Sequence, residues 1–446
     1  MKEWSLGYAF LKQIVRMGMW LSHSRITVIG LSKIPKNKPV IFAPNHQNAL
    51  MDPLAVLCTN HTQPVWLARA DIFKLRITRP ILRFLKILPV YRIRDGKENL
   101  GENERIFARA IEILEHKKEL ALFQEAAHSG KRQMLTPKKA IPRIAFLAEE
   151  KNNFKLDLQI VPVGIYYSHY WHFNRELLVN YGDPIAVGAY ENEFKNDPQK
   201  TTLKLRDAIA ERLESLIINI RSKAHYENYE LMRELLGARQ VNRGPEADHS
   251  MEACFYHDQQ LIKRLEEKEQ EQAGQFQILH QRLDHFRKSL KKLKISGEQL
   301  DRQRIAVGHL ATQSLIGMVL LPLVLLAWLL HLIPFFLPRY FIQKKLKKPE
   351  FFSTFQFVVG LLIYPVITVA LALVAYQSTG QTVWAIVVPA AYLLLGKPAF
   401  LGLKYLQELN TSFRLFRFAM KNKSEADRLF SQKSELIEKL TALINS

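Results

Sequence analysis

A histidine and an aspartate stand six residues apart at the end of an apolar segment near the start of the chain. The segment reads VIFAPNHQNALMDP, so that Val40–Ala43 is followed by a turn, His46 and Asp52. A histidine beside a carboxylate suits general-base chemistry, because the imidazole takes a proton from a hydroxyl while the carboxylate orients the ring and stabilises the imidazolium. We therefore interpret His46 as a candidate base and Asp52 as its partner.

Three further apolar segments also end in polar or turn-forming residues. In open α/β sheets, sites form at the carboxyl edges of the strands. Guanidinium and ammonium groups at such an edge suit a phosphate, which the arginine fork can bind through two hydrogen bonds. The residues concerned are Arg92 and Arg94 in LPVYRIRDG, Glu125, Ser129, Lys131 and Arg132 in LALFQEAAHSGKR, and Pro162 and Gly164 in a strand-ending turn of IVPVG.

These residues need elements that bring them together. Short apolar runs, typical of strands, alternate with amphipathic stretches, typical of helices, over residues 26–226. The clearest helices are expected at Glu104–Lys117 and Pro142–Glu150, and a helix at about residues 200–226 is expected to end the domain. The alternation predicts an α/β domain with a central mixed sheet covered by helices. The expected strands are Ile26–Ile29, Val40–Ala43, Val65–Ala68, Leu120–Phe123, Leu158–Ile165 and Leu177–Val179.

At these residues the chain resembles the glycerolipid acyltransferase family, which includes glycerol-3-phosphate, lysophosphatidic acid and dihydroxyacetone-phosphate acyltransferases and the tafazzin-type enzymes. The family has four ordered motifs: Asn-His followed by an aspartate, an arginine after an apolar strand, Phe-Pro-Glu-Gly with a later serine, and a strand that ends in a proline. The resemblance covers roughly residues 20–220, about half of the chain. The matching positions are Asn45 with His46, Arg92, Phe123 with Glu125 and Ser129, and Pro162.

The chain departs from the family pattern at three places, which concern substrate choice more than reaction type. Five residues rather than four separate His46 from Asp52, and Met51 stands at the four-spaced position. This spacing resembles a subgroup that includes fungal glycerol-3-phosphate and dihydroxyacetone-phosphate acyltransferases. The segment FQEA replaces Phe-Pro-Glu-Gly, and Pro89 stands near the position where the second motif usually has a glycine.

The resemblance implies a role for each matched residue. The acyl donor would be an activated thioester, either acyl-CoA or acyl-carrier protein, and no cofactor or metal is expected. The acceptor would be a glycerophosphate such as lysophosphatidic acid or glycerol 3-phosphate. His46 would be the general base and Asp52 would orient it. The residues that would bind substrate are Asn45, Arg92 and Arg94 for the acceptor phosphate, Glu125, Ser129 and Lys131 around the acceptor, and Pro162 and Gly164 near the donor.

Three long segments without charged side chains lie in the second half of the chain. They are Ser314–Leu337, Thr354–Tyr376 and Thr382–Gly396. Because a bilayer core needs about 20 apolar residues of helix, we expect two or three transmembrane helices within residues 311–405.

The charges that flank these segments predict an orientation. The loop at residues 339–348 and the tail at residues 406–446 are basic, so both are expected on the cytoplasmic side. We expect an integral membrane protein with its catalytic domain on the cytoplasmic face. A re-entrant first segment, interrupted by Pro322 and Pro334, would reconcile these expectations.

Two other regions are amphipathic. Residues 1–25 place apolar side chains opposite Lys12 and Arg16, which predicts either an interfacial helix on a membrane or a helix packed on the catalytic domain. Residues 227–310 read as a linker followed by a long charged helix. Within 261–300 an apolar seam favours either a homodimeric coiled coil or packing within the chain. The seam comprises Phe276, Leu279, Leu283, Phe286, Leu290 and Leu293.

The composition limits the other classes of function. A formal net charge of +21 favours anionic partners, for which an anionic lipid surface suffices. Neither a nucleic-acid-binding motif nor the GxSxG segment or P-loop of hydrolases is present. The two cysteines, Cys58 and Cys254, argue against a disulfide framework or zinc site. His116 and His128 are expected on the surface, and an inactive scaffold that keeps the acyltransferase fold stays open as an alternative.

Overall fold

The computed structural model divides the chain into two compact units. The first comprises residues up to 219 together with 346–357, and the second comprises 220–345 and 358–446. A short segment from the second half of the chain therefore belongs to the first unit. The structure describes residues 5–73, 76, 78–91, 101–125, 127–171, 173–237, 250–345 and 349–445.

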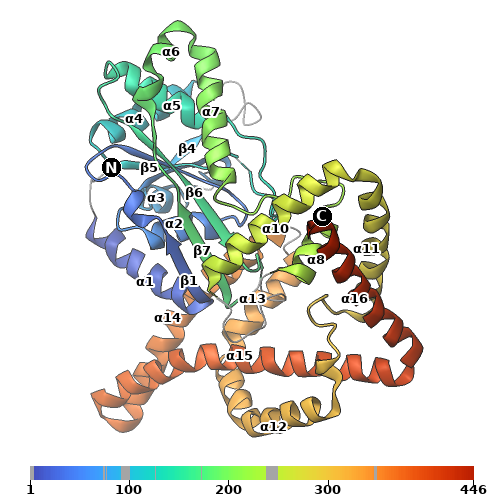
Figure 1. Cartoon of the computed structure of the whole chain (residues 1–446). Helices are drawn as coiled ribbons and strands as arrows, with labels where there is room; N and C mark the ends of the chain where they lie inside the picture. Colours follow the sequence, from blue (N-terminus) through green and yellow to red (C-terminus); the bar gives the residue numbers. More distant parts are fainter. Residues whose placement is uncertain are drawn as a thin grey trace. The chain divides into compact units, whose positions relative to one another are not determined.

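The first unit is built on a mixed sheet whose strands follow the order β1-β7-β6-β2-β5-β3-β4, with β8 paired to β6 (Figure 1). β2 runs parallel to both β5 and β6, whereas β7 runs antiparallel to β6. The expected α/β fold with a central mixed sheet is thus confirmed. The strands are β1 (His23–Ile29), β2 (Val40–Pro44), β3 (Val65–Arg69), β4 (Ile87–Val90), β5 (Glu119–Ala121), β6 (Gln159–Tyr167), β7 (Arg175–Tyr181) and β8 (Ile185–Ala186).

Helices cover both faces of this sheet. Successive side chains of β2 point to opposite faces, so this strand contributes to the core on each side. Ile41 and Ala43 join the core formed with α4, α5 and α7, while the Phe42 ring lies 6.1 Å from the Tyr181 ring on the other face. The helices are α1 (Leu6–Ser22), α2 (Met51–Thr59), α3 (Thr78–Phe84), α4 (Glu102–Glu115), α5 (Ala140–Lys151), α6 (Glu191–Asn196) and α7 (Pro198–Glu214), with short helical turns η1 (Leu31–Lys33), η2 (Ala70–Phe73) and η5 (Val187–Tyr190).

Several boundaries differ from those expected. The helix expected at residues 200–226 ends at Glu214, and α8 (Tyr226–Leu236) occupies part of the expected linker. The strand expected to end in a turn at Pro162 and Gly164 continues without interruption to Tyr167 as β6, so the predicted turn was wrong. The sheet supplies the reason, since β6 is a central strand whose hydrogen bonds to β2 and β7 continue through this segment.

The N-terminal helix α1 packs its Tyr8–Met19 face on the first unit, with Lys12 buried among apolar neighbours. The Lys12 ammonium donates hydrogen bonds to the carbonyls of Asn60 and Thr62 at 3.0 and 2.6 Å, and burial lowers its pKa to about 8. This helix therefore packs on the catalytic domain, as one expectation proposed. Its opposite side leaves four large apolar side chains exposed, so an interfacial role stays a prediction. They are Leu6, Phe10, Met17 and Trp20.

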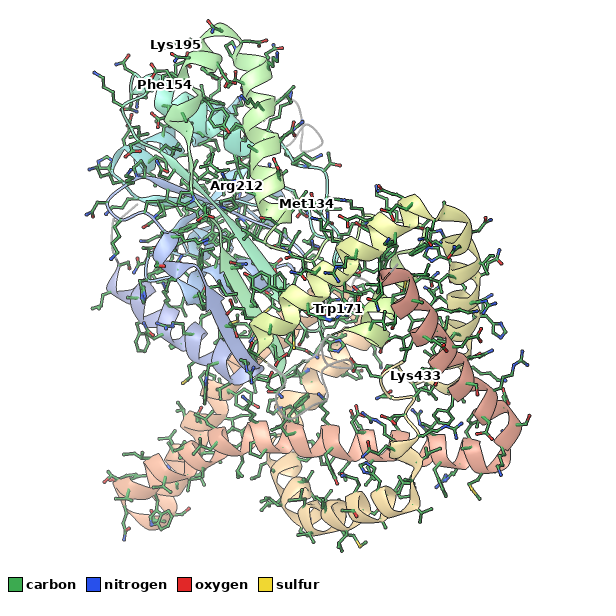
Figure 2. All side chains as sticks on the ribbon, in the orientation of Figure 1. Met134, Phe154, Trp171, Lys195, Arg212 and Lys433 are labelled. Carbon is green, nitrogen blue, oxygen red and sulfur yellow. The ribbon has the colours of Figure 1, made fainter. Side chains whose placement is uncertain are left out.

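A group of amphipathic helices lies in the second unit. The long helix expected at 261–300 is two helices, α10 (Met251–Glu271) and α11 (Ala273–Leu293), which meet at Gln272. The apolar seam of α11 packs against α8, α10 and α16 (Lys423–Asn445), and all of its residues except the half-buried Leu293 are buried. Packing within the chain therefore covers the seam that we also considered for a dimer. Lys433 of α16, labelled in Figure 2, donates hydrogen bonds to the carbonyls of Gly297 and Leu300.

Three of the described helices are long and apolar enough to cross a membrane, judged by length and composition. They are α12 (Val307–Leu330), α14 (Phe352–Thr379) and α15 (Thr382–Lys421). The apolar segment expected at Ser314–Leu337 is divided at His331, after which α13 (Leu332–Lys345) begins. α15 continues past residue 405, so the expected tail consists of its last turns and α16. Two helical turns, η6 (Gln303–Ile305) and η7 (Pro349–Phe351), complete the described elements.

Candidate active site

His46 and Asp52 meet in the loop that joins β2 to α2. The Nδ1 atom of His46 lies 2.8 Å from Oδ2 of Asp52, and the same oxygen accepts the backbone N–H groups of Gln47 and Asn48, both at 2.7 Å. The five-residue spacing is absorbed in the turn, where Ala49 adopts a left-handed φ of 37°. Because Asp52 engages Nδ1, His46 could take a further proton only at Nε2.

The Asp52 carboxylate is fully buried in the first turn of α2. A negative charge there is stabilised by the positive end of the helix dipole and by the two N–H donors. Tyr167 and Arg175 are also buried, and the Asp52 charge affects the pKa of both side chains. The Arg175 guanidinium lies 4.6 Å from the centre of the Tyr167 ring. Burial, with the nearby Asp52 charge, raises the pKa of Tyr167 well above 10, so its hydroxyl stays protonated.

The imidazole of His46 is confined by aromatic rings. It stacks on Phe123, with centroids 3.8 Å apart, and Trp66 packs 5.4 Å behind Phe123. The ring of His128 meets His46 edge-on at 5.1 Å. The expectation that His128 is an ordinary surface residue was therefore wrong, since the loop after β5 folds back over His46. The His46 side chain remains 14% exposed, which leaves it open to a substrate.

Asn45 connects the catalytic loop to β6. Its side-chain nitrogen donates to the carbonyl of Ile165 at 3.1 Å, and its oxygen accepts the Ile165 N–H at 2.7 Å. Both polar groups of the buried Asn45 side chain are thus hydrogen-bonded to the backbone of Ile165 in β6. This contact places His46 beside the sheet. Gly164 sits one residue earlier in β6, where an added Cβ would lie 2.1 Å from the carbonyl oxygen of Leu216. Pro162 pairs with Ala43 of β2.

The predicted acceptor-site residues that follow β5 lie beside the catalytic loop. Glu125 is buried, and among the described residues its two oxygens have no hydrogen-bond partner. Burial raises the pKa of Glu125 to about 8. The Leu135 and His46 backbone amides favour the charged carboxylate, but their effect on the pKa is smaller than that of burial. The Ser129 hydroxyl donates to Gln47 Oε1 at 2.8 Å and accepts the Lys131 N–H at 3.3 Å.

Arg132 anchors this loop from the inside rather than facing an acceptor. Its guanidinium donates to the carbonyls of Tyr167 and Ser168 at 2.9 and 3.0 Å. Gly130 has a φ of 63°, and a Cβ there would meet the ring of Trp171, labelled in Figure 2, at 2.4 Å. A side chain at position 130 would therefore push the loop away from the site.

The two predicted phosphate-binding arginines, Arg92 and Arg94, lie outside the described residues. Sequence reasoning missed Tyr167, Arg175 and Asn48, which support Asp52 and its loop from β6, β7 and the turn itself. It also missed a group in the second unit that could hold a metal ion. Its members are His225, Glu269 and His280, whose ligand atoms lie within 4.8 Å of one another.

Comparison with known proteins places this site in a family. Residues 25–166 match the family model described as Acyltransferase. Over 119 residues the chain is 30% identical to glycerol-3-phosphate O-acyltransferase 2 of Saccharomyces cerevisiae. Residues 25–166 thus form an acyltransferase domain. His46, Asp52, Glu125 and Gly164 all lie within this acyltransferase domain.

The similarity is confined to part of each protein. The match to the yeast protein covers 26% of this chain and 16% of the yeast sequence. Among solved structures, the 1-acyl-sn-glycerophosphate (LPA) acyltransferase PlsC of Thermotoga maritima is 19% identical with a TM-score of 0.33, and the match covers 47% of this chain and 83% of that one.

Proposed function

We propose that the chain transfers a fatty acyl group from an acyl thioester to a hydroxyl of a glycerophosphate acceptor, in phospholipid biosynthesis. The acyltransferase domain supports the reaction class. The observation that carries the proposal is the contact between His46 Nδ1 and Asp52 Oδ2 at 2.8 Å, with the imidazole partly exposed. This arrangement fixes the ring so that one nitrogen is held by a carboxylate and the other faces the substrate side.

The chemistry needs a base but no covalent enzyme intermediate. His46 Nε2 takes the proton of the acceptor hydroxyl, and the buried Asp52 charge stabilises the imidazolium that forms. The hydroxyl oxygen attacks the thioester carbonyl carbon, a C–O bond forms and the C–S bond breaks. The leaving thiolate takes the proton back from His46. The products are an ester and a free thiol, and the base returns to its neutral form.

The acceptor end of the site would combine a neutral acid with basic side chains. Because the pKa of Glu125 is raised to about 8, this carboxyl group is largely protonated at pH 7 and can donate a hydrogen bond. Lys131, with Arg92 and Arg94, would supply positive charge for the acceptor phosphate. We propose lysophosphatidic acid or glycerol 3-phosphate as acceptor and acyl-CoA or acyl-carrier protein as donor.

We further propose that the protein is integral to a membrane, with the catalytic domain on the cytoplasmic face. The three long apolar helices support membrane insertion. The basic segments at 339–348 and 406–446 support the orientation, because such segments stay on the cytoplasmic side and attract anionic lipid headgroups.

Acyl transfer by the purified full-length protein in detergent tests the proposal. Glycerol 3-phosphate, lysophosphatidic acid, dihydroxyacetone phosphate and a lysophospholipid without a terminal phosphate are offered in parallel, each with labelled acyl-CoA and with acyl-carrier protein. Transfer to one of the first two supports the proposal. Transfer only to the last identifies an acyltransferase for another lyso-lipid. No transfer in any combination favours a scaffold that keeps the fold without the activity.

A further inference from the structure

Two hydroxyl side chains from far along the sequence hold the loop that carries the candidate base. The Ser353 hydroxyl donates to Asn48 Oδ1 at 2.6 Å, and the Leu50 N–H donates to Thr354 Oγ1 at 3.1 Å. Both hydroxyls lie in the first turn of α14, within the 346–357 segment that belongs to the first unit. The loop between β2 and α2 is therefore held from a second side.

Asn48 links this contact directly to the candidate catalytic pair. It is fully buried, its N–H donates to Asp52 Oδ2 at 2.7 Å, and its side-chain nitrogen donates to the Tyr170 carbonyl at 3.0 Å. The Ser353 hydroxyl donates to Oδ1, the remaining polar atom of the Asn48 side chain. Hydrogen bonds in such a buried network are costly to remove, because each lost donor leaves an unsatisfied acceptor.

The backbone between Asn48 and Leu50 is of a kind that needs outside support. Ala49 adopts a φ of 37°, in the left-handed region that residues with a side chain rarely occupy. Such conformations persist only where surrounding contacts impose them. Asn48 and Leu50, the two neighbours of Ala49, are the residues that Ser353 and Thr354 hold.

The same segment also reaches the imidazole through a chain of rings. Phe351 meets His128 edge-on, with centroids 5.1 Å apart, and His128 meets His46 in the same way at 5.1 Å. The last residue of η7 therefore touches the ring that limits the movement of His46, while the first turn of α14 holds the loop itself. α14 is also one of the helices apolar enough to cross a membrane.

We infer that Ser353 and Thr354 are positioning residues for acyl transfer. They fix the 46–50 loop so that His46 and Asp52 keep their contact, and they make the first turn of α14 part of the catalytic domain. This inference rests on the proposed function, because its consequence is a change in acyl transfer. It predicts that residues up to 219 are incomplete as a catalyst without residues 346–357.

Four variants of the full-length protein separate positioning from general packing. Ser353→Ala and Thr354→Val each remove one hydroxyl at nearly constant shape, whereas Thr354→Ser keeps the acceptor oxygen. Thr368→Val is the matched control, because the Thr368 hydroxyl bonds to carbonyls of its own helix, at Tyr364 and Pro365. We expect kcat to fall roughly 10- to 100-fold in Ser353→Ala and Thr354→Val. We expect KM values within about twofold of wild type and near-normal kcat in the other two variants.

Hydrogen–deuterium exchange of the peptide that contains residues 45–52 gives a second readout, independent of activity. We expect exchange at this loop to accelerate about tenfold in Thr354→Val and Ser353→Ala, as for the loss of one hydrogen bond, and to stay unchanged in Thr354→Ser and Thr368→Val. Unchanged exchange in the first two overturns the inference. Faster exchange with unchanged kcat also overturns it, because the contact would then not position the base. A wild-type protein without transfer to any acceptor contradicts the proposed function, and exchange alone then decides whether the contact orders the loop.

Discussion

Oδ2 of Asp52 accepts three hydrogen bonds at once, from Nδ1 of His46 at 2.8 Å and from the N–H groups of Gln47 and Asn48 at 2.7 Å. A single buried oxygen thus orients the candidate base and closes the loop that carries it. The pair keeps this contact although five residues separate its members, because the loop absorbs the extra residue through the left-handed Ala49. The following predictions test this arrangement and the residues around it.

Replacing Asp52 with asparagine removes the charge while keeping the shape. We expect kcat/KM for acyl transfer to fall about 10²- to 10⁴-fold, since the imidazolium loses its stabilising carboxylate. Initial rates measured against both substrates check this. Asp183→Asn is the matched control, because Asp183 makes an exposed ion pair with Lys33. Equal activity in the two variants would remove Asp52 from the mechanism.

The buried Glu125 makes stability depend on pH. Its pKa is about 8 in the folded chain against 4.5 ordinarily, so between these values the folded protein holds a proton that the unfolded chain has released. The contribution of Glu125 to the free energy of unfolding is complete below pH 4.5. It is lost as the pH rises through 8, by up to about 1.4 kcal/mol per pH unit. Wild type should therefore lose melting temperature relative to Glu125→Gln as pH rises from 5 to 8.

Thermal unfolding of both proteins in detergent at several pH values measures this difference. Glu112→Gln, on the half-exposed surface of α4, is the control and should follow the wild-type curve. Parallel curves for wild type and Glu125→Gln would mean that this carboxyl group does not retain its proton on folding.

Gly164 is expected to act through packing rather than through contact with the acyl donor. A Cβ at this position would lie 2.1 Å from the Leu216 carbonyl oxygen, so the backbone would have to move. We expect Gly164→Ala to cost about 1–3 kcal/mol of unfolding free energy, as overpacking does elsewhere. Chemical denaturation compares it with Gly274→Ala, where an added Cβ meets nothing within 4 Å. A stable Gly164→Ala protein with a raised KM for the donor would reverse this interpretation.

Much of the first unit could be predicted from the sequence because its signals are local. Short apolar runs such as Val40–Ala43 are typical of buried strands between helices, and the His46 turn follows directly from one of them. The contact between His46 and Asp52 was predicted because only a short turn separates His46 from the first turn of the helix that carries Asp52. The acyltransferase domain then follows from the order of the motifs along the chain.

What could not be predicted depends on contacts between distant residues. Tyr167 and Arg175 sit in strands whose apolar pattern gives no sign that the Asp52 charge acts on them. Ser353 stands directly before the expected membrane segment Thr354–Tyr376, and only folding brings it to Asn48. The Pro162–Gly164 segment was misread as a turn, because proline and glycine usually end strands, whereas here Gly164 allows Leu216 to approach β6.

The central claim is that His46 is the base for acyl transfer, and its direct test is the kcat of His46→Ala in the full-length protein. The acceptor is the one that wild type uses best, and His61→Ala, at an exposed histidine, is the control. We predict that kcat falls at least about 10²-fold in His46→Ala, with an unchanged melting temperature, and stays near wild type in His61→Ala. A folded His46→Ala protein that keeps wild-type kcat would contradict the claim.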